Sequence, residues 1–113
     1  MENDEIRFTL HVKLKKSDIF FGNGICELLE LIDEHHSINV ACENMGMAYS
    51  KAWRIIKKAE SELGYPVITR KIGGNHGGGS VLTLEGKILL QKYKDFRAEV
   101  FQNTEEIFRK YFT

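Results

Sequence analysis

The sequence is poor in the features that mark exported and membrane-spanning proteins. It contains two cysteines, Cys26 and Cys42, which lack CxxC spacing, so we expect two reduced, buried thiols. No apolar run approaches the roughly 20 residues needed to cross a membrane. The acidic start, MENDEIRF, contains no hydrophobic core of an export signal. The low cysteine content and the lack of a long apolar run or an export signal favour a cytoplasmic protein that does not contact membranes.

The sequence also lacks the residue groupings that catalysis and cofactor binding require. The segment from Gly73 to Gly79, GGNHGGG, has neither GxGxxG spacing nor a following Lys-Ser/Thr, so it does not predict a nucleotide-binding loop. His35 and His36 are adjacent and do not share a helix face, which argues against a metal site with Cys26. No nucleophile and base occur at a suitable spacing. We therefore expect no enzymatic activity, no metal and no cofactor.

The formal net charge is zero, but the charges are distributed unevenly along the chain. Residues 1–46 carry four Lys/Arg and nine Asp/Glu, a net charge of −5. Residues 47–84 carry six Lys/Arg and two Asp/Glu, a net charge of +4, and residues 85–113 have a net charge of +1. Because a local positive field matters more for phosphate contact than the total charge, residues 47–84 are suited to nucleic-acid binding.

The centre of the chain, residues 37–65, has the pattern of two helices joined by a tight turn. Ser37 is a suitable N-cap for the first helix, and Gly46 suits the turn because glycine adopts positive φ without steric cost. In the second helix, from about Ala48 to Leu63, apolar residues recur at helical spacing and the opposite side is basic. The apolar stripe is Ala52, Ile56, Ala59 and Leu63, and the opposite side is Ser50, Arg54, Lys57 and Lys58, with Lys51 at its margin. This pattern predicts a helix-turn-helix, although basic helix faces also occur as ordinary solvated surface.

Two elements are expected before this motif. Apolar and polar residues alternate from Ile6 to Leu14, which predicts a strand with one buried face. From Gly24 to His36 the apolar residues follow a helical period, which predicts an amphipathic helix. Its apolar residues are Ile25, Leu28, Leu29 and Ile32.

A β-hairpin is expected directly after the motif. Residues from Pro66 to Thr69 and from Ser80 to Leu82 have strand character, and they flank the glycine-rich segment. A hairpin in this position is a wing, which can lie along phosphates or enter a narrow minor groove. The side chains expected to do so are Arg70, Lys71, Asn75 and His76.

The chain ends in a long helix, residues 84–113, for which Thr83 is a suitable N-cap. Roughly 28 helical residues span about 40 Å, which is longer than a domain of this size covers with its own core. We expect its apolar face to pair with a second copy of the chain; the alternative is a helix packed within the monomer. The expected interface residues are Leu89, Tyr93, Phe96, Val100, Ile107, Phe108 and Tyr111. Residues 1–113 thus predict one domain of the α+β class, mainly α, with an N-terminal strand, a winged helix-turn-helix and a C-terminal dimerisation helix.

The order of several residues resembles the N-terminal domain of LysR-type regulators. These residues are Ala41-Cys42, Met45-Gly46-Met47, Ile56, Glu60, Leu63-Gly64, Arg70, Leu82-Thr83, Gly86 and Leu89-Leu90. The chain is still more similar to the ModE-type, molybdate-responsive regulators. In these the second helix of the motif carries a Tyr followed by Ala-Trp, as at Tyr49 and Ala52-Trp53, and a glycine run precedes Val-Leu-Thr. The resemblance covers essentially the whole chain and implies a winged helix-turn-helix, a dimer built on the terminal helices, and operator binding.

Three departures from these patterns limit what the resemblance implies. Ala59 stands where LysR-type members usually have leucine, which implies a tighter local contact. Arg54 is basic where the ModE-type pattern can be acidic, so the operator sequence does not carry over. Residues 1–113 contain none of the oxyanion-binding domain that follows in ModE-type regulators. We therefore expect no effector-binding domain and no molybdate sensing from these residues.

The functional prediction is a homodimeric transcriptional regulator that binds double-stranded DNA at a pseudo-palindromic operator. The side chains expected nearest the bases of the major groove are Ser50, Lys51 and Arg54, and those expected at phosphates are Lys57 and Lys58. Tyr49 is expected either to donate to a phosphate or to pack at the turn, and Trp53 is expected to pack. The alternative function is a winged-helix adaptor that uses its aromatic tail to dock a protein and does not bind DNA.

Overall fold

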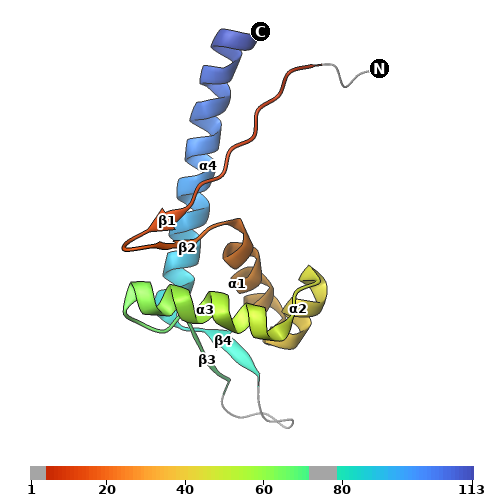
Figure 1. Ribbon diagram of the computed structural model, residues 1–113, viewed down its shortest axis with the longest axis vertical. Coiled ribbons are helices and arrows are strands. Elements are labelled where there is room, and N and C mark those ends of the chain that lie inside the picture. The colour runs from red at the N-terminus through yellow and green to blue at the C-terminus, as the bar shows by residue number, and fades with distance from the viewer. Residues whose placement is uncertain (1–4, 72–78) are drawn as a thin grey trace.

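The computed structural model describes residues 5–71 and 79–113, which form helices and two short antiparallel sheets (Figure 1). In chain order the elements are β1 (Leu14–Lys15), β2 (Ile19–Phe21), α1 (Asn23–His35), α2 (Ile38–Met45), α3 (Tyr49–Leu63), β3 (Ile68–Arg70), β4 (Ser80–Leu82) and α4 (Leu84–Phe112). β1 pairs with β2, and β3 pairs with β4. The predicted class, α+β and mainly α with a winged helix-turn-helix, is confirmed.

The core surrounds α1, which contacts α2, α3 and the first half of α4. Leu28, Leu29 and Ile32 of α1 have 0% exposure, as the amphipathic pattern predicts. α1 ends because His36 adopts a left-handed φ of 56° and donates its backbone N–H to the Ile32 carbonyl at 2.7 Å. An ion pair of 2.6 Å between Lys94 Nζ and Glu30 joins α4 to the solvent side of α1. The hydrogen bond from Lys94 to this carboxylate raises the pKa of the lysine.

The predicted N-terminal strand from Ile6 to Leu14 is wrong for most of its length, because only Leu14–Lys15 is paired. Residues 6–13 are extended and have no strand partner within the described residues. The alternation itself is present, since Phe8, Leu10 and Val12 are partly buried and the residues between them are exposed. An apolar alternation predicts which side chains face inward, but a strand also requires a neighbouring backbone, and β2 is too short to pair with more.

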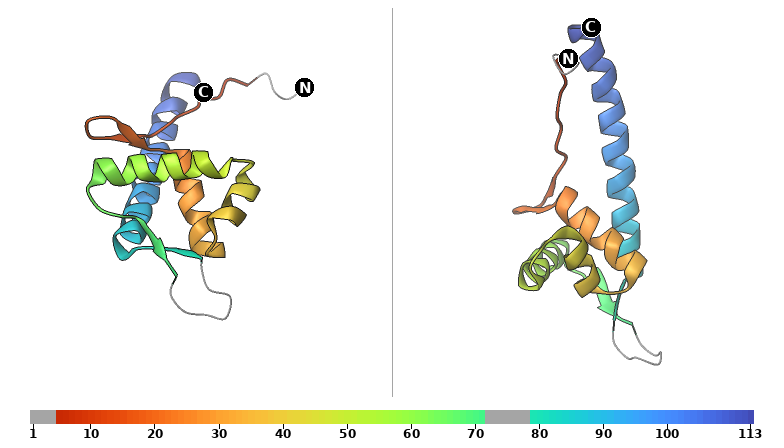
Figure 2. Two further views of the ribbon diagram at one scale, coloured as in Figure 1. Left: turned by 60° about the horizontal axis from the view of Figure 1, so that its bottom comes forward. Right: turned by 90° about the vertical axis from the view of Figure 1, so that its right-hand side faces the viewer.

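The long final helix begins where the sequence predicts. Thr83 Oγ1 accepts the backbone N–H of Gly86 at 2.9 Å, which caps α4. The first half of α4 places Leu90 and Tyr93 in the core, and the second half projects away from the other helices (Figure 2). In the described part of the chain, no helix is both long and apolar enough to span a membrane.

The N-terminal segment begins near the C-terminal end of α4 and runs beside the projecting half of that helix toward β1 (Figures 1 and 2). The ring of Phe8 lies 5.3 Å from that of Phe101 and 5.0 Å from that of Phe108, measured between centroids. At the other end of the N-terminal segment, the Val12 carbonyl accepts a hydrogen bond from the Tyr93 hydroxyl at 2.7 Å. These contacts hold the extended segment on one side of the helix.

Candidate nucleic-acid interface

The turn between α2 and α3 is built as the sequence predicts. Ser37 Oγ accepts the backbone N–H of Val40 at 3.1 Å, which caps α2. Gly46 ends α2 with a φ of 63°, a left-handed conformation that other residues adopt only with strain. α3 then begins at Tyr49, with Ala48 as its N-cap residue. The two helices thereby form a helix-turn-helix.

The buried side of α3 determines which of its residues face solvent. Ala52, Ile56 and Ala59 have 0% exposure, and they pack into the same core as α1 and α2. The opposite side, which we call the basic face, is exposed and consists of Ser50, Lys51, Arg54, Lys57 and Lys58. Within the described residues, neither Lys51 nor Arg54 forms an ion pair. The first half of α3 therefore presents cations that no acidic residue of the described segments neutralises.

The second half of the basic face is different, because acidic residues reach its lysines. Lys58 Nζ lies 2.9 Å from the carboxylate of Asp18, which comes from the turn between β1 and β2. The hydrogen bond from Lys58 lowers the pKa of Asp18. Lys57 Nζ lies 3.3 Å from Glu60 and 5.3 Å from the centre of the Trp53 ring. Both lysines have partners within the chain, although their side chains remain 68% and 51% exposed.

The two aromatic residues of α3 pack against each other at its N-terminal end. The rings of Tyr49 and Trp53 meet edge to face, with centroids 6.3 Å apart. Trp53 is partly buried and packs against the core, which is the packing role expected of it. Tyr49 is 49% exposed. Its ring packs against Trp53 while about half of the side chain stays accessible.

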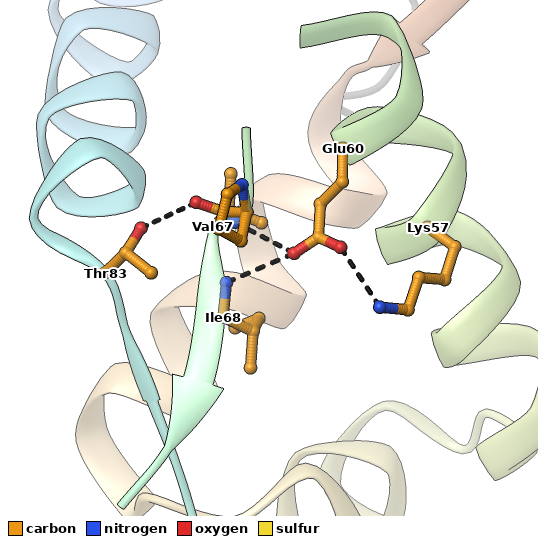
Figure 3. A network of polar contacts seen from close by, with 6 residues as sticks. Lys57, Glu60, Val67, Ile68 and Thr83 are labelled. Carbon is orange, nitrogen blue, oxygen red and sulfur yellow. Dashed lines mark hydrogen bonds and ion pairs between the residues drawn. The ribbon is translucent and has the colours of Figure 1, made fainter. Parts of the chain in front are cut away.

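The wing is attached to α3 by one carboxylate (Figure 3). Glu60 accepts the backbone N–H of Val67 at 2.8 Å and that of Ile68 at 3.4 Å. On the other side, Thr83 donates its hydroxyl to the Pro66 carbonyl at 2.8 Å and its backbone N–H to the Val67 carbonyl at 2.9 Å. The start of β3 is therefore held between α3 and α4, and this fixes where the wing leaves the core.

The predicted wing residues lie next to the basic face. β3 and β4 form the predicted hairpin, with Ile68 opposite Leu82 and Arg70 opposite Ser80. Arg70 and Lys71 are exposed, and Lys71 Nζ lies 3.3 Å from His36 Nδ1. A groove between α3 and the wing is lined by Tyr49, Trp53, Lys57, Ile68, Thr69, Arg70, Gly79 and Ser80. Asn75 and His76 lie outside the described residues.

Replacing Glu60 with alanine should destabilise the protein by about 1–3 kcal/mol, because two backbone N–H groups at the buried start of β3 lose their acceptor. Chemical denaturation measures the loss, and amide hydrogen exchange should show faster exchange at Val67 and Ile68. Glu62→Ala is the matched control, since Glu62 accepts two backbone N–H groups, those of Ser17 and Asp18, at an exposed turn. An equal loss in both variants would contradict the anchoring role of Glu60.

The residues predicted for the dimer interface separate into different environments on α4. Tyr93 is 1% exposed and packs against Phe21, with ring centroids 4.9 Å apart, so it belongs to the core of the monomer. Phe108 is partly buried and is covered on one side by Phe8. The residues that form an exposed or partly exposed stripe are Leu89, Phe96, Val100, Ile107 and Tyr111. Tyr93 is therefore unavailable to a partner, because the monomer already covers it.

The roles of Asp18, Glu60 and Glu62 were not predicted from sequence. Asp18 meets Lys58 from 40 residues away, and Glu62 accepts hydrogen bonds from residues 44 and 45 positions away. Local spacing carries no signal for such pairs. Glu60 could have been considered from sequence, because it lies only seven and eight residues before the two N–H groups that it accepts. The turn at Gly64 and Pro66 between them brings the chain back toward the end of α3.

Together, the exposed basic face of α3, the turn at Gly46 and the anchored wing define a winged helix-turn-helix protein. Residues 26–87, more than half of the chain, match the bacterial regulatory helix-turn-helix proteins of the lysR family. The chain belongs to this family of bacterial regulatory proteins.

The similar proteins agree with this family. The chain is 33% identical over 97 residues to the molybdenum-pterin-binding protein MopB of Rhodobacter capsulatus. It is 32% identical over 106 residues to the transcriptional regulator ModE of Haemophilus influenzae, and 31% identical over 103 residues to the DNA-binding transcriptional dual regulator ModE of Escherichia coli. These matches cover 86% to 94% of this chain but only 36% to 38% of each relative. The chain thus spans little more than a third of the length of these relatives, and its resemblance to LysR-type and ModE-type regulators is confirmed.

Proposed function

We propose that this protein acts in the cytoplasm as a homodimer that binds a pseudo-palindromic operator and regulates transcription. The observation that carries the proposal is the pair Lys51 and Arg54, which are exposed and without acidic partners in the described structure. They lie on a helix whose opposite side is buried at Ala52, Ile56 and Ala59. A helix held in this way can enter the major groove as a rigid unit. A surface helix that served only solubility would have no need of a wing anchored beside it.

In the proposed complex, Ser50, Lys51 and Arg54 lie nearest the base edges, because they occupy the first turns of α3. Lys57 lies farther along and contacts phosphate, while Lys58 contributes less because Asp18 already neutralises part of its charge. In the wing, Arg70 and Lys71 contact the backbone of the flanking DNA, together with Asn75 and His76. Tyr49 donates its hydroxyl to a phosphate at the edge of the groove.

The proposed dimer uses the exposed or partly exposed stripe along α4, which continues onto its projecting half. Phe96, Ile107 and Tyr111 are 51%, 57% and 69% exposed, which is unusual for large apolar side chains on one helix face. Leu89 and Val100 continue the same side of the helix, and Phe108 borders it. Pairing two such stripes around a two-fold axis covers them and presents two α3 helices to two half-sites.

Replacing Arg54 with alanine should weaken operator binding and relax specificity at one base pair of each half-site. An arginine that pairs bidentately with guanine contributes roughly 1–3 kcal/mol of discrimination, so preference for the correct base should fall by roughly 5- to 150-fold. Arg54→Lys is the matched control, because it keeps the charge but loses the two-pronged geometry. It should lose discrimination while retaining most of the affinity for unrelated DNA.

The measurement is a mobility-shift titration at several salt concentrations, on an operator obtained by selection from random DNA. Steep salt dependence is expected, because cations that meet phosphates release counterions. If Arg54→Ala leaves both affinity and base preference unchanged, α3 does not read the groove. If the unmodified protein shows no salt-dependent DNA binding at all, the winged-helix adaptor is the better description.

A further inference from the structure

The N-terminal segment, residues 5–13, is an extended chain without a strand partner in the described structure. Within the described residues, the backbone groups of 6–11 make no hydrogen bond to another element. Unpaired extended backbone of this length readily accepts another strand. The segment is also held in place rather than free, because Phe8 packs between Phe101 and Phe108.

The position of this segment on α4 is related to the position of the proposed dimer stripe. Phe101 directly follows Val100, and Phe108 directly follows Ile107, so each pair is separated by roughly 100° around the helix axis. The stripe therefore points toward a second α4, while the N-terminal segment lies on the adjacent side. In a two-fold dimer of antiparallel helices, this arrangement places both N-terminal segments on the same side of the helix pair.

The stripe is also arranged symmetrically along the helix. Phe96 and Tyr111 are equally far from the midpoint between Asn103 and Thr104, and so are Val100 and Ile107. An antiparallel helix pair centred there brings Phe96 against the partner's Tyr111 and Val100 against the partner's Ile107. Along the axis of α4, Phe8 lies close to this midpoint, because its two aromatic neighbours, Phe101 and Phe108, lie on either side of it.

The exposed face of the N-terminal segment has the charge pattern of a strand that pairs with itself. Glu5, Arg7, Thr9, His11 and Lys13 are all exposed. In an antiparallel pair centred on Thr9, Glu5 of each copy lies opposite Lys13 of the other, and opposite charges in such cross-strand positions are favourable. A pair centred on Leu10 would instead place Arg7 opposite Lys13, and like charges there are unfavourable.

We propose that residues 5–13 pair with the same segment of a second copy, antiparallel and in register at Thr9, so that a two-stranded ribbon lies across the paired α4 helices. The ribbon pairs the backbone groups along one edge of each segment, which have no partner within the described residues. It also adds a specific register to an interface that otherwise consists of an apolar stripe. This inference rests on the proposed homodimer and extends it by naming a second contact.

Cysteine cross-linking tests the register directly. Thr9→Cys should form a disulfide-linked dimer under mild oxidation, because residues opposite each other across an antiparallel pair have Cα atoms about 4.5–5.5 Å apart, within the range that a disulfide spans. Non-reducing electrophoresis detects the linked dimer, and reduction should remove it. Lys16→Cys, an exposed position in the turn between β1 and β2, is the matched control and should stay monomeric on the gel. The unmodified chain should also not link, since Cys26 and Cys42 are buried.

A charge exchange provides a second measurement that does not depend on oxidation. Lys13→Glu should raise the dimer dissociation constant by roughly 2- to 10-fold, because it places two acidic residues opposite each other at both ends of the ribbon. Combining it with Glu5→Lys should restore the original value. Sedimentation analysis gives the dissociation constants. A structural role of Lys13 within the monomer would not be rescued by the second substitution.

The outcomes separate this inference from the proposed homodimer. If the chain sediments as a dimer but Thr9→Cys does not link and the charge exchange shows no rescue, the ribbon is wrong and the α4 interface stands. If the unmodified chain sediments as a monomer at micromolar concentrations, both the homodimer and the ribbon are wrong. Linking at Thr9 together with rescue by Glu5→Lys supports the ribbon.

Discussion

Replacing Ile107 with glutamate is expected to convert the dimer into monomers and to reduce operator affinity by roughly 100-fold or more. Ile107 is 57% exposed in the monomer, so a charge there costs little when the chain is alone. In the proposed dimer the same charge would be buried without a partner, which is strongly unfavourable. Affinity falls because two linked half-site contacts bind far more tightly than one. Sedimentation and mobility-shift titration measure the two effects.

The control for this prediction is Gln102→Glu, which introduces the same side chain on the same part of α4. Residue 102 is exposed and lies on the side of the helix opposite Ile107. It should leave both the dimer and operator binding unchanged, whereas Ile107→Glu should lose both. A dimeric Ile107→Glu protein with full operator affinity would show that the stripe on α4 is not the interface.

Replacing Gly86 with alanine is expected to destabilise the fold by roughly 2–3 kcal/mol, a shift of about 10 °C or more in melting temperature. A Cβ atom at this position would lie 2.4 Å from the carbonyl oxygen of Val67 and 3.1 Å from the Cα of Val67. Both are backbone atoms, which cannot rotate away as a side chain can. Gly86 lies in the first turn of α4, where Val67, the residue directly before β3, passes close to the helix. The substitution forces Val67 and the helix apart, at the point where Thr83 and Glu60 hold the wing.

Gly24→Ala is the matched control for this substitution. Gly24 also lies in the first turn of a helix, but nothing lies within 4 Å of an added Cβ. Alanine there should be neutral or stabilise by up to about 1 kcal/mol, because it favours the helix and restricts the unfolded chain. Thermal denaturation of the two variants gives the comparison. If both variants melt at the temperature of the unmodified protein, the close approach of Val67 and α4 at Gly86 does not constrain the fold.

Much of the fold could be predicted from sequence because its signals are local. The turn at Gly46, the cap at Ser37 and the hairpin around the glycine-rich segment each depend on residues within a few positions of one another. The buried side of α3 followed from the spacing of Ala52, Ile56 and Ala59. The basic face could be identified for the same reason, since it is what remains on the other side of that helix.

Apart from Glu60, the errors and omissions concern partners that are distant in sequence. The strand predicted from Ile6 was wrong, because alternation does not show whether a second backbone lies alongside. Tyr93 was predicted to face another subunit, yet Phe21 and Val12 cover it within the monomer. Lys58 was expected at a phosphate, and nothing in the sequence indicated that the turn between β1 and β2 brings Asp18 to it.

The sequence by itself therefore determined the helices, the turn, the wing and the side of α3 that carries cations, because helical and strand periods and glycine and capping preferences act over short distances. Only the tertiary structure decided which of those cations remain without partners and which aromatic residues of α4 remain exposed. The physical reason is that ion pairs and burial depend on what the rest of the chain brings close. In this protein, Asp18, Glu60 and Phe8 come from other elements to meet α3, β3 and α4.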